Sequence, residues 1–233
     1  MKDRPRHVLA LGPRSRGAAS GLTGLRHGRP TGTAVENEII IPHAAVIAPA
    51  HSVRSTLIQS SLKFLHERGH FERYLRLLAP EHRETIIGTL APTWMPIEVG
   101  IAHYRACDHL DLDAAELIAI GEGVGDRIQG TFMNTLVQTA RVAGVTPWVL
   151  FKRFDRMWGR IFQGGSVQLR KVGPKDIAIE VRGAQLSQFA YFRTAFTGVV
   201  RAGFKVVGVR ASYVKQTPWD PRIDRFTMHA AWV

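Results

Sequence analysis

The segment 145–162 constrains the fold of this chain most strongly, because its apolar side chains recur at the period of one helical face. Pro147 suits the first turn of a helix, and Thr146 can cap that turn through its side chain. A helical face this rich in aromatic side chains must lie against a large apolar surface. The side chains of this face, spaced by three and four positions, are Trp148, Phe151, Phe154, Met157, Trp158, Ile161 and Phe162.

The residues after Gly164 and Gly165 change to a period of two, which predicts β-strands. Two strands, around 167–171 and 177–181, form a predicted hairpin that turns at 173–175. A helix over Ala190–Ala202 follows, and then strands over Lys205–Tyr213 and Arg225–Trp232. The side chains that share one face of each strand are Val167, Leu169 and Lys171; Ile177, Ile179 and Val181; Val207, Val209, Ala211 and Tyr213; and Phe226, Met228, Ala230 and Trp232.

The first half of the chain is mostly helical by pattern. Ser52 can cap the first helix and Gly69 ends it, while Glu38–Ala48 reads as a strand that Pro42 limits to a sheet edge. The predicted helices are Val53–Arg68, His70–Leu78, Glu81–Leu90, Ile97–His109, Ala114–Gln129 and Thr131–Val142. The sequence therefore predicts one α+β domain over 35–233, with an N-terminal helical layer packed on a C-terminal antiparallel sheet of about four strands and one intervening helix.

Half of the net charge of +12 lies in the first 34 residues, which hold seven basic residues and one acidic residue. These residues are rich in Arg, Gly and Pro and have no apolar period, so we expect a disordered basic tail. A tether to nucleic acid or to a membrane is the functional alternative. The single cysteine, Cys107, excludes an internal disulfide. No apolar run is long enough for a membrane span, and we expect a cytoplasmic protein.

Two short motifs resemble known sites but depart from them. His66-Glu-Arg-Gly-His70 has the spacing of a zinc-protease helix, yet Gly69 is expected to end the helix and to take His70 out of register, so we predict no zinc. Gly121-Glu-Gly-Val-Gly125-Asp126 resembles a phosphate loop with aspartate in place of the third glycine. We expect Gly121, Gly125 and Gly130 instead to let another helix approach closely.

Cys107, Asp108 and His109 are adjacent on a helix and so point in different directions, which argues against a nucleophilic dyad. We expect Cys107 in the core. His103 lies one turn earlier and is the best single candidate for a haem or metal ligand, although a satisfied buried histidine is the commoner case. We predict no catalytic residue and no metal ligand, and the sequence specifies no cofactor.

Several local strings resemble a paralogous family of myxobacterial proteins of unknown function. The resemblance covers residues 50–233, and the strings are Glu72-Arg-Tyr, Pro80-Glu-His-Arg, Ile128-Gln-Gly-Thr, Gly144-Val-Thr-Pro-Trp and Tyr191-Phe-Arg. More distantly, the order of helices, hairpin, helix and two strands is similar to the group of 4-vinyl-reductase-like, haem-nitric-oxide-binding and transport-complex domains. That resemblance implies a pocket between helices and sheet for a tetrapyrrole or an acyl chain. The Tyr-x-Ser-x-Arg signature of the haem-nitric-oxide-binding domains does not occur here.

We therefore expect a non-enzymatic sensor or scaffold domain with an apolar small-molecule pocket, acting through contacts with a protein partner or a second copy of the chain. The alternative is a module that binds nucleic acid or a regulator through its basic tail and a basic helix face. The pocket candidates are Trp94, His103, Tyr104, Cys107, Trp148 and Tyr191. The anion-binding candidates, which recur along the aromatic helix, are Lys152, Arg153, Arg156 and Arg160.

Overall fold

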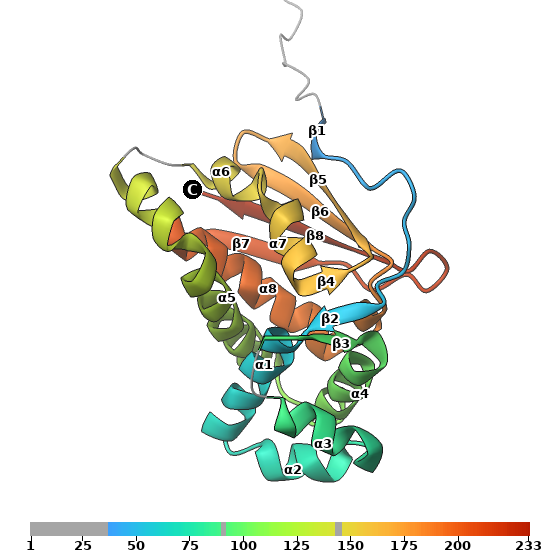
Figure 1. The fold of residues 1–233 in the computed structure, drawn as a ribbon. Coiled ribbons are helices and arrows are strands. Elements are labelled where there is room, and N and C mark those ends of the chain that lie inside the picture. The colour runs from blue at the N-terminus through green and yellow to red at the C-terminus, as the bar shows by residue number, and fades with distance from the viewer. Residues whose placement is uncertain (1–36, 90–91, 143–145) are drawn as a thin grey trace, which may run out of the picture. The chain divides into compact units, whose positions relative to one another are not determined.

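Helices and two antiparallel sheets make up the part of the chain that the computed structural model describes, residues 37–89, 92–142 and 146–233 (Figure 1). The predicted tail, residues 1–34, lies outside the described residues. The helical segments are α1 (Ser55–Glu67), α2 (Phe71–Leu77), α3 (Pro80–Gly88), α4 (Ile97–Asp108), α5 (Ala114–Val142), α6 (Pro147–Phe151), α7 (Phe154–Ile161), the 3-10 turn η1 (Gln185–Gln188) and α8 (Ala190–Val206). The strands are β1 (Glu38–Ile41), β2 (Ser52–Arg54), β3 (Trp94–Pro96), β4 (Phe162–Gln163), β5 (Ser166–Gly173), β6 (Asp176–Arg182), β7 (Ser212–Gln216) and β8 (Arg225–Trp232).

The larger sheet has the order β1-β5-β6-β8-β7, and all of its neighbouring strands are antiparallel. The predicted hairpin is β5–β6, in which Leu169 pairs with Ile179, and β1 is the predicted edge strand, shortened to four residues. One face of the sheet is buried, because Phe226 of β8 contacts aromatic rings of α8 and Trp232 contacts rings of α6 and α8. The α+β class and the face predicted for β8 are thus confirmed.

The strand predicted over 205–213 is wrong. The structure continues α8 to Val206, and β7 begins only at Ser212. Gly208 has φ +75° and its N–H donates to the carbonyl of Lys205, while the next N–H donates to the carbonyl of Phe204. This pair of bonds is the closure that a helix makes when glycine takes the left-handed conformation after its last residue. The alternation of Val207 and Val209 is typical of a strand, but Gly208 between them ends the helix α8.

A second, three-stranded sheet of order β3-β2-β4 has no counterpart in the sequence prediction. Val53, predicted as the start of a helix, is fully buried in β2 and pairs with Met95 of β3 and with Phe162 of β4. Strands of two or three residues are too short to show a period of two. Their pairing partners lie far along the chain, so only the folded structure brings them together.

The aromatic segment forms two helices instead of the predicted single one. α6 and α7 are separated by a turn at 152–153, across which the side chains of Phe151 and Phe154 are both buried. Phe151 packs on Phe204 and Phe154 packs on Phe196, and these partners lie about 12 Å apart along α8 at 1.5 Å per residue. A continuous helix would place residues 151 and 154 only about 4.5 Å apart along its axis, so the chain turns between them.

α5 and α8 cross at glycine residues, as the Gly121-to-Gly125 pattern predicts. A Cβ atom on Gly121 would overlap the backbone of Ala195, and one on Gly125 would lie 2.7 Å from the Cβ atom of Ala202. On the facing helix, a Cβ atom on Gly198 would overlap the backbone of α5. The predicted helices over 114–129 and 131–142 are one helix, α5. Gly130 lies outside the described side chains.

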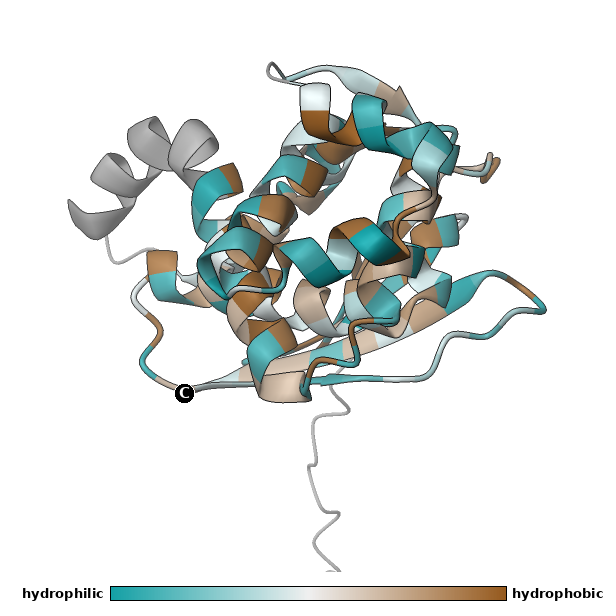
Figure 2. Ribbon diagram, turned by 90° about the horizontal axis from the view of Figure 1, so that it is seen from below, coloured by the Kyte–Doolittle hydropathy of each residue, from teal (hydrophilic) through white to brown (hydrophobic). Residues whose placement is uncertain are grey.

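The start of α8 is fixed by a side chain from another helix. Asp108, at the end of α4, accepts hydrogen bonds from the backbone N–H groups of Ala190 and Tyr191 at 3.2 and 2.6 Å. A carboxylate at a helix N-terminus satisfies N–H groups that have no partner within the helix and complements the helix dipole. The apolar stripes of the helices, seen as brown segments in Figure 2, alternate with hydrophilic ones. Within the described part, none of the helices has the length and apolarity that a bilayer span would need.

Candidate functional site

A small apolar cavity lies where α5, α6, α7 and α8 meet. Its volume is about 30 Å³, which admits one or two water-sized molecules. α7 contributes Met157, Trp158 and Ile161 to its wall. Trp158 is buried, as the helical stripe predicts, and its indole N–H donates to the carbonyl of Gly164 at 3.2 Å. The remaining wall is made by Leu57, Gly125, Ile128, Leu150, Phe151, Phe154, Phe162, Phe192, Phe196, Val199, Val200 and Gly203.

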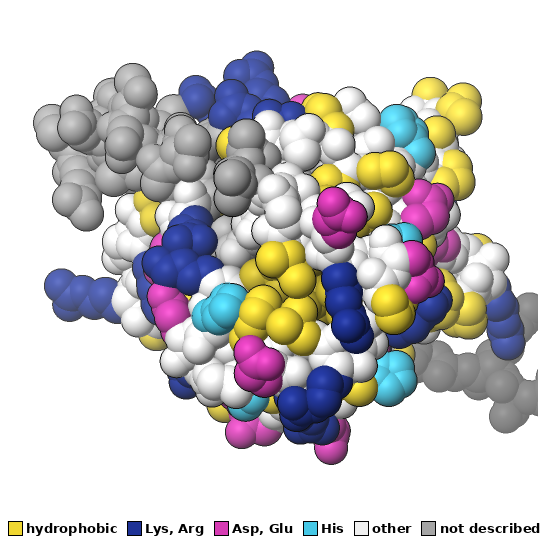
Figure 3. All heavy atoms as spheres, turned by 60° about the horizontal axis from the view of Figure 1, so that its bottom comes forward, with side chains coloured by type: hydrophobic (Ala, Val, Ile, Leu, Met, Phe, Trp, Pro, Cys, Tyr) yellow, Lys and Arg dark blue, Asp and Glu magenta, His cyan; other side chains and the backbone are white. Residues whose placement is uncertain are grey.

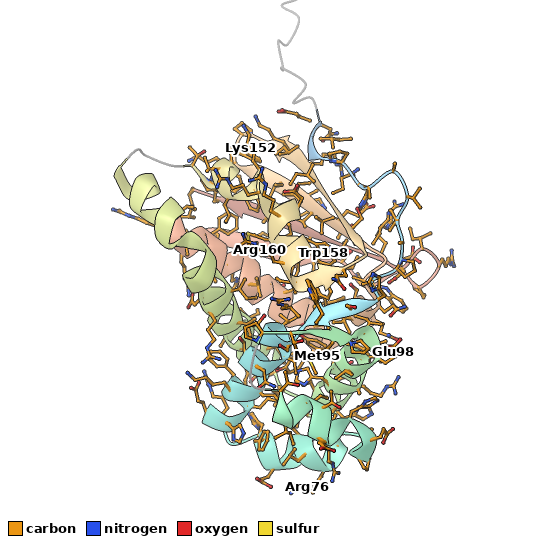
Figure 4. All side chains as sticks on the ribbon, in the orientation of Figure 1. Arg76, Met95, Glu98, Lys152, Trp158 and Arg160 are labelled. Atoms are coloured by element: carbon orange, nitrogen blue, oxygen red, sulfur yellow. The ribbon has the colours of Figure 1, made fainter. Side chains whose placement is uncertain are left out.

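An open cleft, which we call the arginine cleft, adjoins this cavity, because Ile128 and Ile161 line both. Its volume is about 640 Å³, within the range of small-molecule sites. In Figure 4, Arg160 and Trp158 lie on α7 above the strand that carries Met95. The described residues that line the cleft are Arg54, Thr56, Gln59, Ser60, Pro92, Trp94, Arg127, Ile128, Gly159, Arg160 and Ile161.

Four of the six predicted pocket residues lie together in the core. His103, Tyr104, Cys107 and Tyr191 are buried where α4 meets α8, with the rings of His103 and Tyr104 4.9 Å apart and those of Tyr104 and Tyr191 5.9 Å apart. Trp94 lines the arginine cleft instead. Trp148 is on α6, where its ring packs against Trp232 and its indole N–H donates to the carbonyl of Pro174. The six residues therefore do not line one pocket.

The buried group is a hydrogen-bonded network without available acid–base chemistry. Tyr74 Oη and His103 Nδ1 lie 2.9 Å apart, and Cys107 Sγ lies 3.6 Å from His103 Nε2. Burial lowers the pKa of His103 to about 3 and raises the pKa of the Cys107 thiol well above its ordinary value. The imidazole is therefore neutral and the thiol is protonated at neutral pH, and a protonated thiol is a poor nucleophile. Tyr191 and Ser61 complete the network at 2.9 Å.

The two histidines of the zinc-like motif have different surroundings. α1 ends before Gly69, as expected, and the ring of His66 stacks on Phe71 at 3.5 Å. His70 Nε2 lies 2.7 Å from a carboxylate oxygen of Glu116 on α5. Across the described residues, no group of three or more His, Cys, Asp or Glu side chains is arranged to hold a metal ion.

A serine, a histidine and a glutamate meet on the sheet, and the sequence reasoning did not find them. His43 Nδ1 lies 3.0 Å from Ser166 Oγ, and His43 Nε2 lies 3.1 Å from Glu180. These are the residue types of nucleophilic hydrolysis. Ser166 is only 5% exposed, however, and its oxygen already accepts the N–H of Ala44 at 3.0 Å. The cluster attaches the segment after β1 to β5 and β6 and presents no accessible nucleophile.

The charge on Glu180 strengthens its hydrogen bond to His43, which attaches the segment after β1 to the sheet. Burial opposes the ionisation of Glu180, but hydrogen bonds from His43 and Arg182 outweigh it and hold the pKa of this carboxyl below its usual value. Arg182 Nε donates to Glu180 at 2.6 Å. Glu180 therefore carries a negative charge at neutral pH and stays bound to both neighbours.

The anion-binding candidates divide into two groups. All four are exposed, but Lys152, Arg153 and Arg156 lie on the turn before α7 and on its first half, whereas Arg160, near the end of α7, lines the arginine cleft. Arg54 and Arg127, which line the cleft with Arg160, were not predicted. They come from β2 and α5, and no local pattern connects three arginines so far apart in the sequence.

An apolar depression lies on the face formed by α2, α3 and α4. Figure 3 shows hydrophobic side chains gathered on this face among acidic, basic and histidine side chains. The depression has a volume of about 280 Å³, and Leu77 is 39% exposed at its edge. Glu81, Glu98 and Arg105 supply charges around it.

The solved structures that this fold resembles include haem-nitric-oxide-binding domains, abbreviated H-NOX. The Fe(II) unliganded H-NOX protein from K. algicida aligns with a TM-score of 0.53 and 6% identity over 77% of this chain and 96% of that chain. The fold is H-NOX-like. An oxygen-binding H-NOX domain related to soluble guanylate cyclases aligns with a TM-score of 0.50 and 10% identity over 76% of this chain and 94% of that chain. No protein-family model and no curated protein sequence matches the chain.

Among the described residues, those that line the apolar cavity do not fit an iron-ligated haem. The apolar cavity offers no His, Cys or Tyr side chain among its described residues, and Met157 supplies its sulfur without a partner histidine. His103 is fully buried against Tyr74 and Cys107 and does not line the cavity. A volume of about 30 Å³ is also far below that of a tetrapyrrole site, since pockets for drug-sized ligands run to about 300 Å³ or more.

Proposed function

We propose that this chain is a non-enzymatic sensor domain of the cytoplasm that binds a small organic molecule in the arginine cleft and signals through protein contacts. The H-NOX-like fold supports a sensor, because its structural neighbours include an oxygen complex and an unliganded iron form. The cleft is large enough for such a ligand, whereas the cavity is not. From the local sequence strings, we also propose membership of the myxobacterial paralogous family.

The observation that carries this proposal is the position of α7 between the cleft and the core. Gly159, Arg160 and Ile161 line the cleft, and Ile161 also lines the apolar cavity together with Trp158. α7 leads directly into β4, whose Phe162 pairs with β2. A molecule bound in the cleft therefore contacts a helix that is joined to both the core and the small sheet. A shift of α7 on binding would reach each of them.

Native mass spectrometry of the protein purified from its own host tests the proposal. We expect a retained mass below about 1 kDa, in the range of drug-sized ligands. Replacing Gly159 by leucine should abolish retention, because Gly159 lines the cleft and nothing lies within 4 Å of a Cβ atom placed on it. Gly88→Leu is the matched control at an equally open glycine outside the cleft. Equal retention by both variants, or a bare wild-type protein, would contradict the proposal.

Binding of nucleic acid or an acidic regulator is the second candidate, favoured by the exposure of Lys152, Arg153 and Arg156. Binding to duplex DNA should then weaken steeply with salt. For each phosphate contact, the logarithm of the binding constant should fall by about 0.9 for a tenfold rise in salt concentration. Fluorescence anisotropy at several salt concentrations measures this slope. Arg156→Gln should lower it by about one contact, and a flat salt dependence would remove this candidate.

A further inference from the structure

The arginine cleft gathers positive charge from three separate elements. Arg54 extends from β2, Arg127 from α5 and Arg160 from α7, and no Asp or Glu lines the cleft among the described residues. Guanidinium groups are planar, permanently charged and suited to bidentate contacts with phosphate or carboxylate oxygens. Three guanidinium groups lining one space favour an anion of more than one charge.

One wall of the cleft is aromatic and apolar. The guanidinium carbon of Arg54 lies 4.9 Å from the centre of the Trp94 ring, the distance of a cation–π contact. Ile128 and Ile161 extend this wall toward the cavity. The cleft therefore presents a charged side and an apolar side to the same molecule.

Neutral polar groups from the start of α1 complete the lining. Thr56 and Ser60, which both carry hydroxyl groups, line the cleft. The amide nitrogen of Gln59 donates to the carbonyl of Ile86 at 2.6 Å. Hydroxyl groups donate to phosphate oxygens, so Thr56 and Ser60 add to the donors of the three arginines.

We propose that the arginine cleft binds an organic phosphate, with the phosphoryl dianion held by Arg54, Arg127 and Arg160 and the organic part against Trp94 and Ile161. This inference rests on the proposed function, which assigns the cleft as the ligand site. A carboxylate is satisfied by one bidentate arginine, whereas a phosphoryl group offers three oxygens and two charges. A volume of about 640 Å³ exceeds what inorganic phosphate alone would fill, so the ligand carries a larger organic group.

Isothermal titration calorimetry with phenyl phosphate, inorganic phosphate and benzoate tests the ligand class. We expect phenyl phosphate to bind at least tenfold more tightly than benzoate or inorganic phosphate. Arg160→Gln should weaken phenyl phosphate at least tenfold, while Arg156→Gln, one turn away and outside the cleft, should leave it unchanged. Trp94→Leu should weaken phenyl phosphate more than it weakens inorganic phosphate, because only phenyl phosphate places an organic group against this ring. Melting curves of all variants confirm that each is folded.

Three results would overturn the inference. Benzoate binding as tightly as phenyl phosphate would show that the cleft does not select a dianion. A loss in Arg156→Gln equal to that in Arg160→Gln would move the site to the basic side chains outside the cleft. No binding of any probe, with a retained mass that Gly159→Leu abolishes, would reject the phosphate class and keep the proposed function. No binding and no retained mass would reject both.

Discussion

Replacing Gly198 by alanine tests the crossing of α5 and α8 directly. A Cβ atom on Gly198 would overlap the carbonyl oxygen of Ile118 and lie 2.5 Å from the backbone nitrogen of Glu122. Non-bonded heavy atoms rest about 3.5 Å or more apart, so α8 would have to move away by more than about 1 Å. The obstructing atoms belong to the backbone of α5 and cannot rotate aside.

The cost follows from two opposing terms. Overpacking a core typically costs about 1–3 kcal/mol, and the upper end applies here because backbone meets backbone. Alanine is also a better helix former than glycine, by about 1 kcal/mol. We therefore expect Gly198→Ala to lower the free energy of unfolding by about 2 kcal/mol. For a domain of this size, that corresponds to a drop of about 4–8 °C in Tm.

Gly159→Ala is the matched control, because it is a glycine inside a helix with nothing within 4 Å of the added atom. Only the helix-propensity term applies there, so its Tm should rise by about 2–4 °C. Differential scanning calorimetry of both variants measures the opposite shifts. A Gly198→Ala protein as stable as the wild type would show that α5 and α8 do not approach at this glycine.

The remaining predictions concern burial, capping and protonation. Trp158→Ala should cost about 3–5 kcal/mol in urea unfolding and Arg156→Ala less than about half a kcal/mol, because only the tryptophan is buried; equal midpoints would contradict this. Asp108→Ala should cost about 1–2 kcal/mol by leaving two N–H groups of α8 without acceptors, and an unchanged Tm would show that this cap is dispensable. The pKa of His103 is lowered to about 3 in the folded protein, whereas in the unfolded chain it stays near 6.5. As pH falls below about 6.5, His103 therefore binds a proton in the unfolded chain but not in the folded protein. Stability should therefore decrease by up to about 3 kcal/mol between pH 7 and pH 4.5, and urea midpoints of His103→Gln should show a flatter dependence. Deleting residues 1–34 should leave Tm within a few degrees, since no apolar period there can join the core; a larger drop would show that these residues are packed.

Elements with a long and consistent local pattern were predictable from the sequence. The strand Arg225–Trp232 alternates apolar residues over its whole length, and the helical stripe that includes Trp158 is buried as expected. Gly69 ends α1 because its backbone adopts φ +76°, which glycine tolerates at no steric cost. In each case the deciding interaction lies within a few residues of the chain.

The parts that depend on distant partners were not predictable. β2 is a strand because Met95 and Phe162 pair with Val53, and neither partner is near it in the sequence. The arginine cleft has the same origin, since only Arg160 of its three arginines stood in a recognisable series. His103 was singled out as a candidate ligand, but its hydrogen bond to Tyr74 shows a partner that spacing alone could not reveal.

The small sheet sets an order in which the chain can fold during synthesis. Its central strand, β2, needs β4, and Phe162 follows Val53 by about 110 residues. At the usual rate of translation, about 5–20 residues per second, Phe162 is synthesised roughly 5–20 s after Val53. The hairpin β5–β6, by contrast, closes over a turn of a few residues and forms within microseconds once both strands exist. A ribosome-bound chain that ends before Phe162 therefore exposes one edge of β2 and part of the apolar surface around it. We expect chaperones to bind the nascent chain at this surface.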